Sequence, residues 1–430
     1  MPRIEEGPGA QGDAEIAAQP RMAPRQFSLR TFESLKVRNY RYYFFSSLGH
    51  MASMNMQMVV NGWLVYKLTG STALLGVTML GNAIPTLLLS LFGGIIADRV
   101  RKKPVLILGL LASGLLALGI ALSISLDIIT WHYLVVNSVV QGIIFSLMMP
   151  SRMSIVSELV GRERLTNAVS LNAAAMNINQ IGAPAVAAFL LASIGVESVY
   201  YGAAALYLLA AIFFFPVRQQ PGSQISQALP QEDVLQSIKS GIVYVRRNQA
   251  LLAVLLLSLL TVMFSMPFRM LLPVFTEDIY KVGPDKLGYL LSVSGVGALA
   301  GSFITASMGN KGRGMLFLHT GIITGASILA FSISTSYTLS MAIIVVTGLG
   351  QAGRMALGNA LLQYYTDDAY MGRVMSLFMM QWGLVSLGTF VVSVAAEFVG
   401  VQLAVGATAV LLLMTTLYYY AFSPRIRRLD

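Results

Sequence analysis

The chain has 430 residues, of which 56% are hydrophobic and 11% are charged, and its mean hydropathy is +0.69. Soluble domains carry roughly 25% charged residues, so this composition excludes the soluble classes and indicates a membrane protein. The chain has no cysteine and only three scattered histidines, which excludes disulfides and thiolate nucleophiles and predicts neither a metal site nor a cofactor.

Residues 1–35 form the first predicted region. They are rich in Pro, Gly, Ala, Gln and charged residues, and they contain no apolar run. This composition predicts a disordered tail. The apolar stretch of a secretory signal is absent, so we expect the first membrane helix to direct insertion.

Beyond the tail, twelve segments are long and apolar enough to cross a membrane, since a hydrocarbon core about 30 Å thick needs roughly 20 apolar residues of helix. The predicted spans are 40–68, 72–97, 104–126, 130–151, 166–192, 197–217, 250–276, 286–308, 314–333, 337–362, 373–399 and 401–422. We therefore expect an all-α membrane protein with two six-helix bundles, over 36–217 and 249–424, and a short tail over 425–430.

The segment 218–248 separates the two predicted bundles. Its first part is polar, while Val234, Ile238, Ile242 and Val245 recur at helical spacing with basic residues beside them. This pattern predicts a linker that ends in an amphipathic helix lying on the membrane face.

The positive charge is distributed unevenly along the chain. Only Lys67, Lys281 and Lys286 lie in predicted loops on one side, and nearly all other Lys and Arg residues fall in the tail, the opposite loops and the adjoining helix ends. Because Lys and Arg in short loops stay on the cytoplasmic side, both termini and the linker are predicted to be cytoplasmic, in the inner membrane. This bias accounts for the net charge of +10 without a nucleic-acid partner.

A charged stretch stands between the second and third spans. It resembles the signature loop of the major facilitator superfamily, which has a glycine, three residues, Asp-Arg and a basic cluster. Gly94, Asp98, Arg99, Arg101 and Lys102 fall on that pattern, although the usual glycine after Asp-Arg-x is absent.

Further stretches in both halves look like the branch of this superfamily that includes enterobactin and macrolide exporters. They are 62–76, 150–160, 240–248 and 372–377. The resemblance implies a secondary transporter with a cavity near the membrane midplane. It also implies that Asp98 and Arg99 lock the bundles together at the cytoplasmic face when the transporter is open outward. The alternative is that the basic cluster only enforces orientation.

Two further family motifs are only partly present. The Arg-x-x-Gln-Gly motif of proton-coupled relatives keeps Gln141 and Gly142, but Ser138 stands in place of the arginine. The antiporter Gly-Pro motif keeps Gly182 and Pro184 with alanines in place of other glycines. A packing kink at the proline is an equally good interpretation of the second motif.

Polar residues at membrane depth are the candidates for substrate and proton sites. His50 is the candidate proton carrier, with a hydrogen-bonded packing role as its alternative. The amides could line a substrate cavity or act as interhelical hydrogen bonds. The amide side chains in question are Asn55, Gln57 and Asn61 in the first span, Gln141 in the fourth, and Asn177 and Gln180 in the fifth.

Charged residues inside the spans are few. Arg269 lies well inside the seventh span, where it could bind an anionic group or pair with Glu277, and it predicts a preference for anionic or neutral ligands. Arg354 is close enough to a helix end to extend to the membrane surface. The acidic residues fall near the outer helix ends, and Trp63 is predicted to anchor the interface.

The pattern as a whole predicts a secondary active exporter rather than an enzyme. Its expected substrate is an amphipathic small molecule, such as a drug-like compound or a siderophore, and its expected coupling ion is a proton. No Gly-x-x-x-x-Gly-Lys-Ser/Thr loop is present, so ATP is not the direct energy source. A lysophospholipid or lipid transporter and a non-transporting membrane sensor are the alternatives. We expect a monomer in the lipid bilayer.

Overall fold

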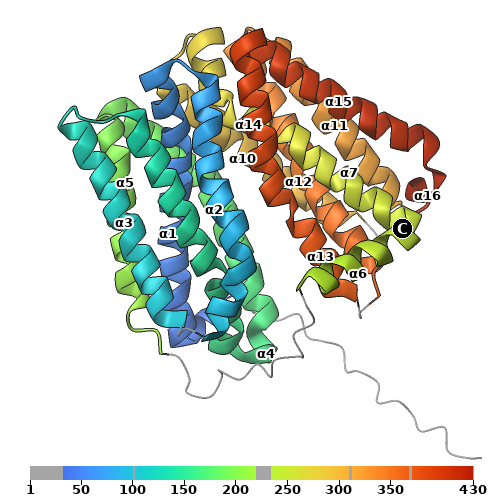
Figure 1. Cartoon of the computed structure of the whole chain (residues 1–430), viewed down its shortest axis with the longest axis horizontal. Helices are drawn as coiled ribbons and strands as arrows, with labels where there is room; N and C mark the ends of the chain where they lie inside the picture. The colour runs from blue at the N-terminus through green and yellow to red at the C-terminus, as the bar shows by residue number, and fades with distance from the viewer. Residues whose placement is uncertain (1–31, 100–101, 219–233, 309–311, 368–369, 430) are drawn as a thin grey trace, which may run out of the picture.

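The computed structural model describes residues 32–99, 102–218, 234–308, 312–367 and 370–429, and its regular secondary structure over those ranges is entirely helical (Figure 1). Eleven helical stretches of this part of the chain are long and apolar enough to cross a membrane. The helix α1 (Arg38–Thr69) is 32 residues long but falls short in hydropathy because polar residues interrupt it. With α1, the predicted all-α fold of twelve membrane helices in two bundles is confirmed.

The N-terminal bundle contains five helices that make six spans. They are α1, α2 (Thr72–Arg99), α3 (Lys102–Ser125), α4 (Trp131–Ser193) and α5 (Val196–Phe214), preceded by the 3-10 turn Glu33–Lys36. The label α4 covers two spans, whose helices extend into residues 152–165 from either side. A kink at Gly161 separates them, and its non-helical backbone has a φ of 70°, which glycine readily adopts.

The C-terminal bundle is built in the same way from more numerous pieces. They are α7 (Gln249–Ser265), α8 (Pro267–Met270), α9 (Leu272–Val274), the π-helix Phe275–Ile279, α10 (Pro284–Ser307), α11 (Arg313–Ile333), α12 (Tyr337–Tyr364), α13 (Met371–Met379), α14 (Gln381–Val399), α15 (Val401–Phe422) and α16 (Pro424–Arg427). The helix α6 (Val234–Arg247) precedes this bundle and packs against α13 and α7.

The seventh predicted span is a broken helix. Pro267 and Pro273 lack the N–H that an α-helix needs, so α7 gives way to the short helices α8 and α9 and then to a π-helical turn. Broken membrane helices are tolerated where the backbone faces protein or a cavity, and this break faces the other bundle.

The two bundles share an apolar core at one end of the molecule and have separate apolar cores at the other end. One cluster joins both bundles and includes Met56 and Leu64 of α1, Ala187 of α4, Phe275 and Leu287. Two other clusters each stay within a single bundle. The bundles therefore share a core at the end that carries the α1–α2 and α14–α15 turns, which we call the closed end. They lean apart toward the opposite end, the open end (Figure 1).

Glycines permit the close crossings that join the bundles. The main contacts between bundles pair α4 with α10 and α2 with α14. A Cβ on Gly288 of α10 would stand 2.0 Å from the Ala188 Cβ and 2.7 Å from the Pro184 carbonyl oxygen of α4. One on Gly76 of α2 would stand 2.8 Å from the Cβ of Ser393. Both crossings therefore depend on the absence of a side chain.

Candidate functional site

Two carboxylates of the C-terminal bundle hold α1 at the closed end. The Trp63 Nε1–H donates to Glu277 Oε1 at 2.6 Å, and the Lys67 Nζ lies 3.9 Å from Glu277 Oε2. The Tyr66 hydroxyl donates to the Asp278 carboxylate. The three α1 residues are spaced i, i+3 and i+4, so they share one helix face. Trp63, predicted to be a membrane anchor, therefore donates a hydrogen bond between bundles.

A third carboxylate holds the start of α2. Glu397 Oε2 lies 3.1 Å from the Ala73 backbone nitrogen, 3.1 Å from the Ser71 hydroxyl and 2.9 Å from the Thr72 hydroxyl. The Thr72 hydroxyl is also 2.8 Å from the Ser393 carbonyl oxygen, and its single proton serves one acceptor at a time. Because a carboxylate stabilises the positive end of a helix dipole, Glu397 caps a helix of the other bundle.

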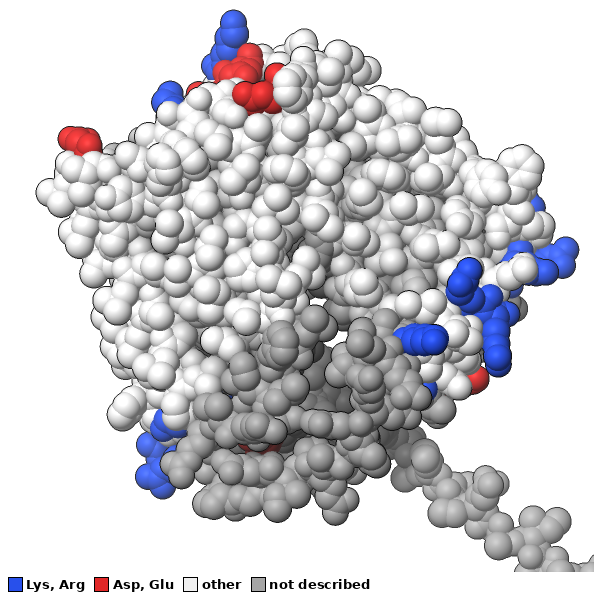
Figure 2. Space-filling model, viewed as in Figure 1, with Lys and Arg blue, Asp and Glu red and all other residues white. Residues whose placement is uncertain are grey.

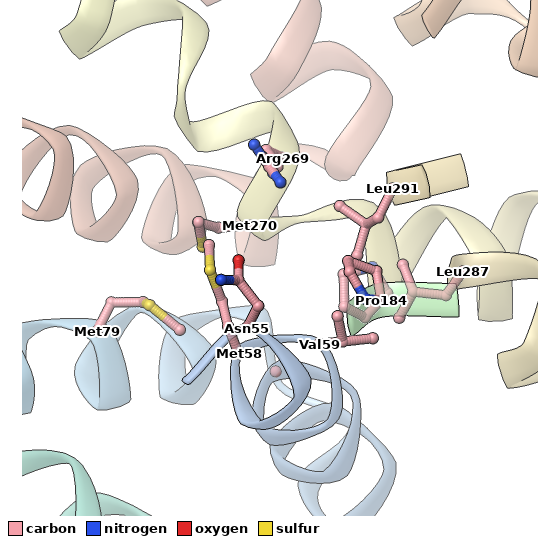
Figure 3. Close-up of a pocket in the computed structure, with 11 residues that line it drawn as sticks. Asn55, Met58, Val59, Met79, Pro184, Arg269, Met270, Leu287 and Leu291 are labelled. Atoms are coloured by element: carbon pink, nitrogen blue, oxygen red, sulfur yellow. The ribbon is translucent and has the colours of Figure 1, made fainter. Parts of the chain in front are cut away.

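A pocket lies between the bundles, lined by residues of both (Figure 3). The empty space among its lining residues is about 420 Å³ when the part open to solvent is counted, and the room for a water-sized molecule inside it is about 20 Å³. Its lining residues are Asn55, Met58, Val59, Gly62, Met79 and Pro184 of the N-terminal bundle and Arg269, Met270, Pro273, Leu287 and Leu291 of the C-terminal bundle. The wall is therefore mostly apolar, with one cation and one amide.

Arg269 is the cation of this pocket. It projects from the four-residue helix α8, and its Nε is buried without a hydrogen-bond partner. No carboxylate lies within ion-pair distance of it among the described side chains. Glu277, the predicted partner, contacts Trp63 and Lys67 instead. The guanidinium group of Arg269 therefore has no counter-charge among the described side chains.

The predicted cavity amides separate into two groups. Asn55 lines the pocket and donates one N–H to the Met51 carbonyl at 2.8 Å. Gln57 is 8% exposed and faces Tyr207 inside the N-terminal bundle. Asn61 lies 3.4 Å from the Ser138 hydroxyl and 3.5 Å from the Tyr200 hydroxyl, again within that bundle.

The other predicted amides also lie away from the pocket lining. Gln141 accepts a hydrogen bond from the Ser113 hydroxyl at 3.1 Å. Asn177 and Gln180 are half-buried on α4, and the Gln180 carbonyl oxygen lies 3.4 Å from the position of a Gly295 Cβ. The Gln141 contact is a hydrogen bond between helices of one bundle, which is typical of interhelical packing.

The two residues of the partial antiporter motif, Gly182 and Pro184, lie two positions apart on α4 and so face different sides of the helix. Pro184 lines the pocket, and its carbonyl oxygen faces Gly288 of α10. A Cβ added to Gly182 would meet no atom within 4 Å. Pro184 therefore lies where the bundles meet, whereas Gly182 does not supply a close crossing.

His50 lies inside the N-terminal bundle and is 8% exposed. Its ring contacts the Tyr207 ring edge-on at 5.6 Å, and its Nδ1 has no hydrogen-bond partner. The positive charge of Arg152 acts on it from α4. A proton on His50 would therefore meet a like charge at low dielectric.

The residues of the predicted cytoplasmic latch are described only in part. Gly94, Asp98 and Arg99 belong to the last turns of α2, but their side chains lie outside the described part of the chain, as does Arg101 altogether. Lys102 pairs with Glu158 of α4. That ion pair stays within the N-terminal bundle.

Arg354 differs from its predicted position at a membrane surface. It is 3% exposed, donates from Nη2 to the Leu257 carbonyl at 2.8 Å and stacks 4.7 Å from the Phe317 ring centroid. It packs α12 against α7 and α11, and Gly321 leaves room for it. Its role is therefore internal to the C-terminal bundle.

The sequence places Glu277, Asp278 and Glu397 near outer helix ends but does not predict what these carboxylates bind. The polar sequence Thr-Gly-Ser-Thr at 69–72 marks a helix start. Nothing local pairs these positions with Glu397, more than 320 residues away. Among the described residues, no group of His, Asp or Glu could hold a metal ion.

Comparisons with known proteins agree with this architecture. The family model described as transmembrane secretion effector matches residues 30–429. The staphyloferrin A transporter of Staphylococcus aureus is 22% identical over 390 residues, covering 90% of this chain and 96% of the relative. The enterobactin exporter of Escherichia coli (strain K12) is 24% identical over 371 residues, covering 83% and 86%.

Solved structures share the fold. An inward-facing, unoccupied bacterial homologue of the human lysosomal transporter Spinster has a TM-score of 0.69 at 13% identity, covering 92% of this chain and 97% of that one. A nucleoside transporter has a TM-score of 0.69 at 15% identity, covering 89% and 98%. The chain therefore belongs to the transmembrane secretion effector family, within the major facilitator superfamily of transporters and in its enterobactin exporter-like branch.

Proposed function

We propose that this transporter exports an amphipathic small molecule by alternating access. The observation that carries the proposal is the divided core: the bundles share one apolar cluster at the closed end and have separate clusters at the open end. A pocket lies between them. Alternating access requires two states, each closed at one end and open at the other around a pocket. The structure has the features of one of these states.

The charge distribution supports an open end that faces the cytoplasm. Most Lys and Arg side chains visible in Figure 2 lie toward the open end, while Asp and Glu gather near the closed end. By the positive-inside rule, the termini and α6 are then cytoplasmic and the closed end faces outward. The protein would sit in the inner membrane and take up its cargo from the cytoplasm.

The pocket wall supports an amphipathic cargo. Met58, Met79 and Met270 offer flexible apolar surface, and Asn55 and Arg269 offer polar groups. The names of the relatives, an enterobactin exporter and a staphyloferrin A transporter, make a siderophore the first substrate to test. We further propose that the protein functions as a monomer in the bilayer. We expect it to act as a multidrug antiporter that exchanges its substrate for a proton.

The proposed function is tested by complementation and flux. A cell that makes enterobactin but lacks its exporter should release enterobactin when this protein is supplied. Purified protein in liposomes should then exchange labelled enterobactin across the membrane. Binding without exchange would instead identify a sensor, and exchange of lysophospholipid alone would identify a lipid transporter.

We propose that Asp98 and Arg99 form the latch of the opposite state, in which the cytoplasmic ends meet. Asp98→Asn removes the charge and keeps the shape, so it should abolish or cripple transport while leaving insertion and ligand binding largely intact. The measurement is exchange in liposomes beside binding in detergent. Wild-type exchange in this variant would reduce the loop to a role in orientation.

We propose His50 as the carrier of the coupling proton, because its unpaired Nδ1 can accept one. His50→Gln should then remove the pH dependence of uptake into inverted vesicles while sparing exchange at constant pH. The positive charge of Arg152 disfavours a protonated His50 imidazole. A loss of pH dependence in His50→Gln would therefore mean that His50 carries the proton despite this repulsion. An unchanged pH profile would transfer the coupling role to other groups, of which Glu277, Asp278 and Glu397 are the next to examine.

A further inference from the structure

The pocket between the bundles holds a positive charge that no described group of the protein neutralises. Arg269 lines it, with a buried Nε that has no hydrogen-bond partner. Taking a cation out of water costs several kcal/mol unless a counter-charge and hydrogen bonds replace the water. Arg354, which has a packing role, also keeps a buried Nε and Nη1 without hydrogen-bond partners, but its Nη2 donates to the Leu257 carbonyl and its guanidinium stacks on the Phe317 ring. No such contact is described for the Arg269 side chain.

The nearest carboxylates along the chain are already engaged. Glu277 binds Trp63 and Lys67, and Asp278 binds Tyr66. Both therefore face α1 at the closed end rather than Arg269. The field inside the pocket is set by the guanidinium group, because charge interactions are weakly screened away from bulk water.

The wall opposite Arg269 supplies an amide and apolar surface. Figure 3 shows Asn55 of α1 and Arg269 on different sides of the pocket, which Met58, Met79 and Met270 also line. Asn55 uses one N–H on the Met51 carbonyl, which leaves its second N–H and its oxygen for a ligand. The pocket thus combines a cationic group, a hydrogen-bonding amide and an apolar wall.

We propose that the substrate class of this pocket is the organic anion: an amphiphile whose carboxylate or similar oxyanion binds Arg269, whose neighbouring polar group binds Asn55, and whose apolar body lies on the methionines and leucines. This inference rests on the proposed function, since it names the cargo of that pocket. A cation of the same size binds more weakly because Arg269 repels it.

The test is equilibrium binding of three matched probes to purified protein in detergent. They are 2-naphthoate, 2-naphthamide and 2-naphthylmethylammonium, which share a ring system and differ in charge. The wild type should bind the anion at least about tenfold more tightly than the cation. Arg269→Gln should lower the affinity for 2-naphthoate by at least about fivefold and change the affinity for 2-naphthamide by less than about twofold.

Two further variants keep the test decisive if Arg269→Gln does not fold. Asn55→Asp places a carboxylate opposite Arg269, so it should lower the affinity for 2-naphthoate and raise that for the cation. Met79→Leu alters the same wall without a charge and should preserve the wild-type order of the probes. Equal wild-type affinities, or a cation that binds best, would overturn the assignment, as would an Arg269→Gln variant that keeps the anion affinity.

Binding in detergent needs no membrane gradient and no movement of the bundles. The anion preference therefore stands or falls apart from transport. Exchange of enterobactin in liposomes tests the transport function by itself. If the protein prefers 2-naphthoate but does not exchange enterobactin, the anion-site proposal stands and the exporter proposal is wrong.

Discussion

Glu397→Gln is expected to open the closed end and to deplete the conformation described above. The substitution keeps the side-chain shape but removes the charge that caps α2 across the two bundles. Because Glu397 is exposed, solvent screens its charge, and the interaction with the helix dipole and its donors is worth about 0.3–1 kcal/mol. The ratio of closed to open molecules should therefore fall about two- to fivefold.

The absence of cysteine makes the measurement direct, since spin labels can be placed without removing native thiols. Leu68 of α1 and Phe398 of α14 are 41% and 83% exposed at the closed end, and cysteines there would report the distance between bundles. Glu397→Gln should increase the long-distance population. Glu197→Gln, which removes a carboxylate from α5 with no described bond to the other bundle, is the matched control. An identical distance distribution in wild type and Glu397→Gln would contradict the capping role.

Gly288→Val is expected to have the larger effect and to prevent the closed end from forming. Its Cβ would stand 2.0 Å from the Ala188 Cβ and 2.7 Å from the Pro184 carbonyl oxygen, and neither of these atoms can rotate away. The clash lies between bundles rather than within one. Each bundle should therefore fold, while transport falls to background because one of the two required states is lost.

Flux in liposomes and the same closed-end spin labels measure this outcome. Gly297→Val is the contrasting variant, because its Cβ would stand 2.0 Å from the Val345 carbonyl oxygen inside the C-terminal bundle. That change should lower thermal stability, whereas Gly288→Val should alter the distance between bundles at nearly unchanged stability. The exchange Gly288→Ala with Ala188→Gly should restore part of the flux lost in Gly288→Ala alone. Full transport by Gly288→Val would show that the α4–α10 crossing is not required.

Some features of the transport site could be predicted from the sequence, and others could not. Arg269 was identifiable because a charge within an apolar span is costly wherever it lies. Asn55, Gln57 and Asn61 were indistinguishable by that criterion, since all three are amides on one helix. Helical spacing puts Gln57 and Asn61 on one face and Asn55 on another. Only packing shows that Asn55 faces the other bundle, whereas Gln57 and Asn61 face their own.

The sequence by itself determined that the protein crosses the membrane twelve times in two groups of six. Hydropathy and helix length are properties of single segments, so they need no knowledge of neighbours. The helices of the fourth and fifth spans extend past their predicted ends toward Gly161, because a polar segment can remain helical beyond the apolar part of a span.

The tertiary structure alone decided which end is closed and what closes it. Glu277 and Trp63 are 214 residues apart, and Glu397 and Thr72 are 325 apart. Each pair forms only when the two bundles pack, because the donor lies on one bundle and the acceptor on the other. The physical reason is that a carboxylate at a helix end has many equivalent partners in water. Only the shared apolar core at the closed end brings a particular one within reach.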